Sequence, residues 1–152
     1  MFVLVSDSVI YRTKPGETYQ PKIGAFLGDM TNELADYGEG AYIEEFVSGG
    51  PKNYAYRVKK PDGTRESKIK IRGFTLSHHT ASHLNQQNLK KKVFKFVKEG
   101  LKLKTPVVFP QISRTANREV VTQDVMKEYG VTYDKRWVLG DFSTLPYGAC
   151  DV

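Results

Sequence analysis

The apolar residues of this chain occur mostly in short β-prone runs, which glycine- and proline-containing turns interrupt. Such runs cover residues 2–5, 41–47, 54–58 and 67–72, and others follow at 107–112, 120–126 and 131–139. One longer stretch, residues 81–99, spaces its apolar side chains near helical periodicity, and Gly100 can end a helix there. A chain with this pattern is expected to form an α+β fold with short connections.

Several local patterns refine this expectation. Residues 1–11 consist of an apolar run, a short polar tip and a second apolar run, which predicts a β-hairpin. Residues 13–22 are expected to form a loop, and residues 27–34 a short helix with Asp29 or Thr31 as its N-cap. Residues 67–72 alternate basic and apolar side chains, so we expect a strand with one basic face.

Charge is distributed unevenly along the chain. Residues 1–50 have a net charge of −5, and residues 105–152 have a net charge of −1. Residues 51–104 contain fifteen basic and three acidic residues, a net charge of +12. A block this basic favours a polyanionic partner, since phosphate contacts are a common reason for such a bias. The alternative is a lysine-rich face that is simply solvated.

Length and composition exclude several classes of protein. The 152 residues suit one domain or a piece of a larger one, and the single cysteine, Cys150, cannot form an internal disulfide. No apolar run is long enough to span a membrane, and the N-terminus does not resemble a signal peptide. We therefore expect an intracellular protein without a membrane partner. Nucleotide-binding loops and nucleophile motifs of hydrolases are also absent from the sequence.

Candidate functional residues fall in three short segments. Asp7 at the tip of the hairpin is a candidate ligand for Mg²⁺, which prefers oxygen donors. Lys52 and Tyr54, two positions apart, are expected on one face of a strand, where a cation and a phenol suit a sugar-phosphate backbone. Lys70 and Arg72 on the basic strand suit phosphates as well. The alternatives are an Asx-type turn at Asp7, a half-buried edge strand, and solvated lysines.

Taken in order, these segments resemble family B DNA polymerases, in particular the protein-primed type of viruses and of Polinton or Maverick DNA transposons. The first hairpin resembles the YxDTDS motif, and Lys52-Asn53-Tyr54 matches the Lys-x-Tyr motif at a fitting distance downstream. Four further segments add to the resemblance. They are residues 27–34, the basic strand with its glycine at 70–76, and two C-terminal segments at 134–137 and 144–148. The resemblance covers nearly the whole chain.

The resemblance implies that residues 1–76 form the C-terminal part of a polymerase palm, built from antiparallel strands. Residues 77–152 would then contain a helix, a β-rich thumb and the C-terminal segment. In the YxDTDS motif Asp7 and Ser8 match, whereas Val3 and Val5 replace the tyrosine and the first aspartate. Asp7 is thus the implied catalytic residue and metal ligand. The family's DxxSLYP motif, fingers motif and exonuclease domain have no counterpart in this sequence.

Three functional hypotheses follow. The first is a DNA polymerase fragment that binds primer–template DNA through Lys52, Tyr54, Lys70 and Arg72. A complete enzyme would also need the missing upstream polymerase region, and within that enzyme the fragment would use Mg²⁺ and dNTPs. The second is a stand-alone basic DNA-binding module without catalysis, and the third is a decayed polymerase remnant. The isolated chain is expected to be inactive, because two-metal phosphoryl transfer needs carboxylates from separate strands.

Overall fold

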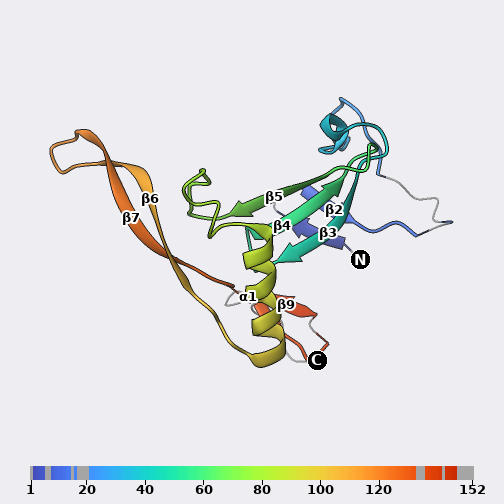
Figure 1. Ribbon diagram of the computed structural model, residues 1–152. Coiled ribbons are helices and arrows are strands. Elements are labelled where there is room, and N and C mark those ends of the chain that lie inside the picture. The colour runs from blue at the N-terminus through green and yellow to red at the C-terminus, as the bar shows by residue number, and fades with distance from the viewer. Residues whose placement is uncertain are drawn as a thin grey trace.

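A computed structural model describes residues 2–5, 8–14, 16, 21–132, 136–141 and 143–146 of the chain. The fold is α+β, as the sequence predicts, and every pair of neighbouring strands is antiparallel (Figure 1). The elements, in chain order, are β1 (Phe2–Val5), β2 (Ser8–Tyr11), the 3₁₀ helix η1 (Ala35–Tyr37), β3 (Tyr42–Ser48), β4 (Asn53–Lys59), β5 (Arg65–Ile71), α1 (Gln86–Glu99), β6 (Thr105–Arg114), β7 (Val120–Tyr129), β8 (Arg136–Val138) and β9 (Thr144–Pro146).

The centre of the molecule is the three-stranded sheet β3-β4-β5, with α1 packed against it. Ala55 in the middle strand has no exposed surface, and neither does Leu89 of α1. These two residues share a core cluster with Leu84, Val107, Phe109 and Tyr129, so sheet, helix and the β6–β7 hairpin meet in one apolar cluster. Burial of these side chains is the main force that holds the three parts together.

The helix α1 is shorter than the sequence predicts. It begins after Asn85, whose side-chain oxygen accepts a hydrogen bond from the backbone N–H of Asn88 at 2.9 Å. The Asn85 side-chain amide also donates to the carbonyl oxygens of Ala81 and Ser82, which holds residues 81–85 in turns. The helix ends at Gly100, whose φ of 68° is the left-handed conformation typical of a helix C-terminus.

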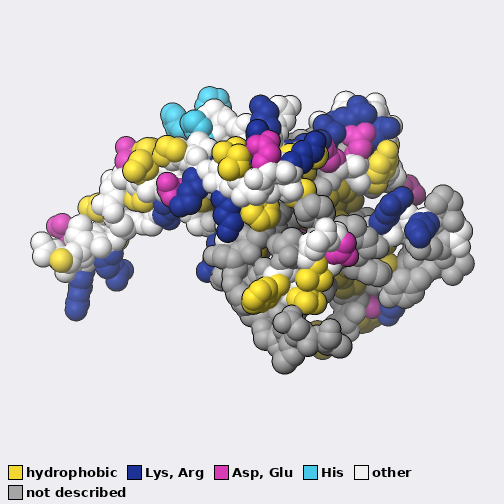
Figure 2. Space-filling view, turned by 90° about the horizontal axis from the view of Figure 1, so that it is seen from below, with side chains coloured by type: hydrophobic (Ala, Val, Ile, Leu, Met, Phe, Trp, Pro, Cys, Tyr) yellow, Lys and Arg dark blue, Asp and Glu magenta, His cyan; other side chains and the backbone are white. Residues whose placement is uncertain are grey.

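The hairpin of β6 and β7, which we call the arm, projects from the sheet and helix (Figures 1 and 2). The two strands are ten residues long and pair without a bulge from Thr105 opposite Tyr129 to Arg114 opposite Val120. At the base of the arm one face is buried through Val107 and Tyr129, whereas the other face is exposed along its whole length. Basic side chains lie at its far end (Figure 2).

The predicted hairpin over residues 1–11 is confirmed by β1 and β2. The predicted helix over residues 27–34 is wrong, because this segment forms turns and a single bridge between Ile23 and Met30. Asp29 does not cap a helix but accepts a hydrogen bond from the backbone N–H of Phe26 and forms an ion pair with Lys22. The predicted strand over 131–139 is reduced to β8, which pairs with β9.

Candidate nucleic-acid interface

The structure brings the four predicted DNA-binding residues together at one end of the β4–β5 pair. Tyr54 lies directly opposite Lys70, and Asn53 lies opposite Ile71 on the next rung. One position further, the backbone N–H of Arg72 donates to the carbonyl oxygen of Lys52 at 2.9 Å. Four residues, which we call the strand end, therefore lie within three successive positions where the β4–β5 pair ends: Tyr54 and Lys70 within the strands, and Lys52 and Arg72 just outside them.

Tyr54 is the buried member of the strand end, with an exposed fraction of 7%. Its ring packs against Phe46 and Tyr56, at centroid distances of 5.7 and 6.3 Å. The amino group of Lys70 lies 6.0 Å from the centre of the same ring. The pKa of Lys70 is raised, first by the charge interaction with Tyr54 and then by a side-chain hydrogen bond to it. Because Tyr54 is buried, it mainly holds the charged amino group of Lys70 in place and presents little surface to a ligand.

Lys52 lies in the turn before β4 rather than within a strand. Its φ of 56° is in the left-handed region, and its side chain is exposed. The alternation of faces that applies inside a strand therefore does not relate Lys52 to Tyr54. The turn itself is held in place, because the backbone N–H of Thr132 donates to the carbonyl oxygen of Gly49 at 2.7 Å. The position of Lys52 is thus tied to the segment that follows the arm.

A second group of aromatic and basic residues lies further along the β4–β5 pair, toward its other end. The amino groups of Lys60 and Lys68 lie 5.6 and 5.9 Å from the ring centre of Tyr37. Burial raises the pKa of Tyr56, and Glu33 adds to the rise in the pKa of Lys70. The Glu33 carboxylate accepts a hydrogen bond of 2.8 Å from the hydroxyl of Ser8 at the start of β2. This bond connects the N-terminal hairpin with the surroundings of Lys70; Asp7 lies outside the described residues.

Ion pairs neutralise much of the basic block but not the strand end. Seven of its fifteen basic residues form ion pairs with carboxylates: Arg57, Lys60, Arg65, Lys68, Lys90, Lys95 and Lys104. Within the described part of the chain, no ion pair is found for Lys52, Lys70 or Arg72. The positive charge that remains available to an anion therefore includes these three neighbouring side chains.

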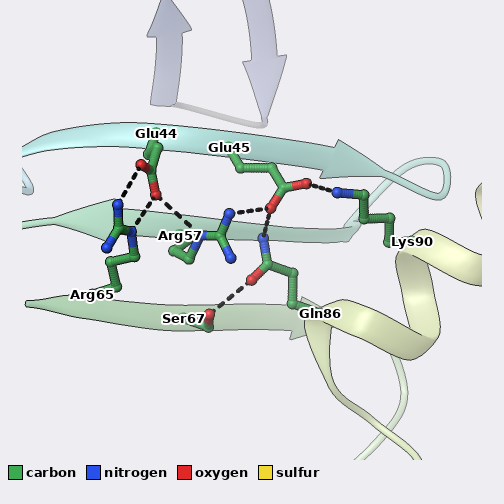
Figure 3. A network of polar contacts seen from close by, with 7 residues as sticks. All are labelled: Glu44, Glu45, Arg57, Arg65, Ser67, Gln86 and Lys90. Carbon is green, nitrogen blue, oxygen red and sulfur yellow. Dashed lines mark hydrogen bonds and ion pairs between the residues drawn. The ribbon is translucent and has the colours of Figure 1, made fainter.

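Sequence reasoning missed the polar network that joins the sheet to α1 (Figure 3). A β-bulge in β3, between Ile43 and Glu45, lets the consecutive residues Glu44 and Glu45 both reach Arg57. The carboxylate of Glu44 also accepts two hydrogen bonds from Arg65, one from Nε at 2.9 Å and one from Nη2 at 3.1 Å.

From α1, two side chains complete this network. Lys90 forms an ion pair with Glu45, and Gln86 donates to the same carboxylate at 3.1 Å while its oxygen accepts a bond from Ser67. Lys90 is therefore engaged in holding the helix on the sheet. In the sequence, the only signal for this network is a pair of adjacent glutamates within a predicted strand. The bulge that brings both glutamates to one arginine depends on the pairing of β3 with β4, which the sequence does not specify.

A pocket of about 230 Å³ lies beside the strand end, between the sheet and the base of the arm. Its walls come from Pro51, Asn53, Ile71, Arg72, Phe74, Glu128, Tyr129, Gly130 and Thr132. The Asn53 amide donates to the carbonyl oxygens of Gly49 and Gly130, at 3.3 and 2.9 Å. Asn53 thereby fastens the strand end to the chain segment that leaves β7, and Arg72 lies at the resulting junction.

The described residues contain no cluster of three or more histidine, cysteine, aspartate or glutamate side chains suited to a metal ion. Among the described helices, none has the length and apolar character needed to cross a bilayer. Comparison of the chain with protein-family models, with curated protein sequences and with solved structures gives no match.

Proposed function

We propose that this chain is the palm end and thumb of a family B DNA polymerase of the protein-primed type, and that its strand end contacts the backbone of primer–template DNA. The observation that carries the proposal is the grouping of Lys52, Lys70 and Arg72 without carboxylate partners among the described residues. The proposal also relies on the order of sequence motifs, in which Lys52 and Tyr54 match the Lys-x-Tyr motif.

The physical basis is the attraction between fixed cations and phosphates. Cations that replace the counterions of DNA contribute affinity that falls as the salt concentration rises. Contacts to phosphates fix the position of a protein on DNA but carry no sequence information. Tyr54 supports this contact indirectly, because its buried ring and hydroxyl hold the amino group of Lys70 in place. Little sequence preference is therefore expected.

In this proposal the arm corresponds to the thumb and the β1–β2 hairpin to the YxDTDS hairpin. The Ser8–Glu33 hydrogen bond supports the second assignment, because it brings the hairpin near Lys70. A primer–template that contacts the strand end would therefore pass close to Ser8, the residue after the candidate metal ligand Asp7.

The proposal is tested by measuring binding to a fluorescent primer–template at several salt concentrations. Lys52→Ala and Lys70→Ala should each weaken binding to all sequences and reduce the slope of log affinity against log salt by about one. Lys95→Ala is the matched control, since it removes one lysine charge that Glu99 already neutralises at 2.8 Å. Binding by both variants that equals the parent at every salt concentration would contradict the proposal.

The same charge distribution also supports a stand-alone DNA-binding module without catalysis, because unpaired cations attract any duplex. The two functions differ in what they recognise. A polymerase fragment should bind a recessed primer end more tightly than a blunt duplex of equal length. A general binding module should bind both with the same affinity and the same salt dependence.

A further inference from the structure

The two outer edges of the arm differ in their capacity to accept another strand. The backbone N–H of Thr115 donates to the carbonyl oxygen of Glu119 at 2.9 Å, which makes this rung a hydrogen-bonded one. Rungs of an antiparallel pair alternate between hydrogen-bonded and non-hydrogen-bonded. In β6 and β7 the even-numbered residues therefore direct their backbone N–H groups away from the partner strand, toward the outer edges of the arm.

Proline closes one of these edges but not the other. Pro106 and Pro110 occupy two of the five outward positions of β6, and neither has an N–H to offer. The outward positions of β7 carry no proline: they are Val120, Thr122, Asp124, Met126 and Glu128. Within the described residues no further strand pairs with β7. Proline on an edge strand is a known protection against strand addition, so its absence from β7 leaves this edge open.

The side chains along this edge are complementary to themselves in an antiparallel arrangement. If two copies of β7 pair about a two-fold axis at Gln123, Val120 lies opposite Met126 of the second copy, and Val121 lies opposite Val125. Val120 and Met126 are now exposed, with exposed fractions of 67% and 68%. The arrangement would give each of them an apolar neighbour across the strands.

Charges favour the same register. It places Glu119 opposite Lys127 of the second copy, and neither forms an ion pair within the described residues. The amino group of Lys127 donates to the neutral oxygens of Gly73 and Gln111, so its charge is not neutralised by these contacts. A two-fold axis at Asp124 would place two identical carboxylates opposite each other. An axis at Thr122 would place the apolar Val120 opposite Asp124. The register centred on Gln123 thus pairs apolar residues with apolar ones and opposite charges with each other.

We propose that the chain self-associates through β7, which pairs with β7 of a second copy to join the two arms into one four-stranded antiparallel sheet. A two-fold symmetric contact of this kind uses the same surface on both copies. The backbone groups of Val120, Thr122, Asp124 and Met126 then form the hydrogen bonds between the copies. The proposal is independent of DNA binding and would hold if the proposed function failed.

The first test compares two proline substitutions on one rung, because Thr122 lies directly opposite Ile112. Each substitution removes one outward N–H from the arm, but only Thr122→Pro removes it from the edge used by the second copy. We expect the full-length parent to shift from monomer to dimer with rising concentration in sedimentation experiments. Thr122→Pro should weaken this dimer at least about tenfold, whereas Ile112→Pro should leave it within about twofold.

The second test measures the register and does not depend on proline. Gln123→Cys, in a background with Cys150→Ser, should form a disulfide-linked dimer under mild oxidation, because equivalent positions at the axis lie close together. Ile112→Cys on the other edge should remain a monomer. Circular dichroism of every variant checks that the fold is kept. A parent that stays monomeric up to its solubility limit, or equal cross-linking of the two cysteine variants, would overturn the proposal.

Discussion

Lys92 differs from the other lysines of α1 because it is buried, with an exposed fraction of 6%. Lysine side chains are rarely buried, because taking an ammonium group out of water is costly unless it is hydrogen-bonded. The amino group of Lys92 donates to the hydroxyl of Thr105 at 2.6 Å and to the carbonyl oxygen of Leu103 at 3.3 Å. It also lies 5.5 Å from the ring centre of Tyr129. One lysine therefore connects α1 with both strands at the base of the arm.

Removing the acceptor of this buried cation should cost more than removing the cation. Thr105→Val leaves the amino group of Lys92 without its shortest hydrogen bond, and we expect a loss of about 1–3 kcal/mol in the free energy of unfolding. Lys92→Met replaces the lysine by an apolar side chain of similar length and should cost less. Urea unfolding of both variants measures the difference. A larger loss for Lys92→Met would contradict this ranking.

The Lys92 site also has a defined pH dependence. Burial lowers the pKa of Lys92 from its usual 10.5. Between the lowered pKa and 10.5 the unfolded chain binds more protons than the folded chain, so stability increases with pH in this window. The parent should therefore gain stability relative to Lys92→Met as the pH rises toward 10.5. Thermal unfolding at a series of alkaline pH values measures the gain.

At the scale of elements, the turn between β3 and β4 forms a close backbone contact with the segment after β7. Gly50 has a φ of 119°, and a Cβ atom there would lie 1.9 Å from the carbonyl oxygen of Thr132. Gly50→Ala should therefore destabilise the protein by several kcal/mol, on the order of 3 or more. Gly40→Ala is the control, because Gly40 has a φ of 83° with open space around it and should lose only about 1 kcal/mol.

Acid should weaken the ion pairs that Glu66 of β5 forms with Lys60 and Lys68. Hydrogen bonds from Lys68 and Lys60 lower the pKa of Glu66 to about 2, from an ordinary value of 4.5. A lowered carboxyl pKa gives stability that is complete above 4.5 and is lost as the pH falls toward 2. Glu66→Gln should make the melting temperature less dependent on pH in this window.

For the whole molecule, we predict that the purified chain does not extend a primer with Mg²⁺ and dNTPs. In the proposed match to the YxDTDS motif, Asp7 takes the place of the second aspartate, whereas Val5 takes the place of the first and offers no oxygen to a metal. Two-metal transfer needs several carboxylates, so Val5→Asp should not restore activity to the isolated chain. Primer extension measures both proteins, with Asp7→Ala to reveal contaminating polymerase. Extension by the parent that disappears in Asp7→Ala would contradict the prediction.

Local patterns predicted most of the elements, because each depends on nearby residues. The alternation in residues 67–72 and the polar tip of the first hairpin led to strands that the structure contains. The helix over 27–34 failed because Gly28 adopts a φ of 92°, and turn hydrogen bonds to Asp29 replace the helical ones. Apolar spacing alone does not reveal such side-chain competition for the backbone.

Features that depend on long-range pairing were not predicted. The burial of Lys92 follows from the position of the arm against α1, which no local pattern specifies. The candidate site is partly predictable from the sequence, since its patterns single out Lys70 and Tyr54, but only the pairing of β4 with β5 shows that the two residues face each other. The burial of Tyr54 and the turn conformation of Lys52 could not be derived from spacing, because both depend on how β4 is covered and entered.

The bulge in β3 also determines where this sheet can change its length. Glu44 is the extra residue between the pairs Ile43–Val58 and Glu45–Arg57. If Glu44 were deleted, Ile43 would still lie opposite Val58, and Glu45 would still lie opposite Arg57. Every remaining side chain of β3 would therefore keep its face of the sheet. The loss would be confined to the polar contacts of the Glu44 carboxylate. Deleting Phe46 would instead move Glu45 to the place of Phe46 opposite Tyr56, even if the bulge closed to take up the lost residue, and would put a carboxylate on the face of an aromatic ring. Single-residue deletions in β3 are therefore tolerable at the bulge and disruptive elsewhere in the strand.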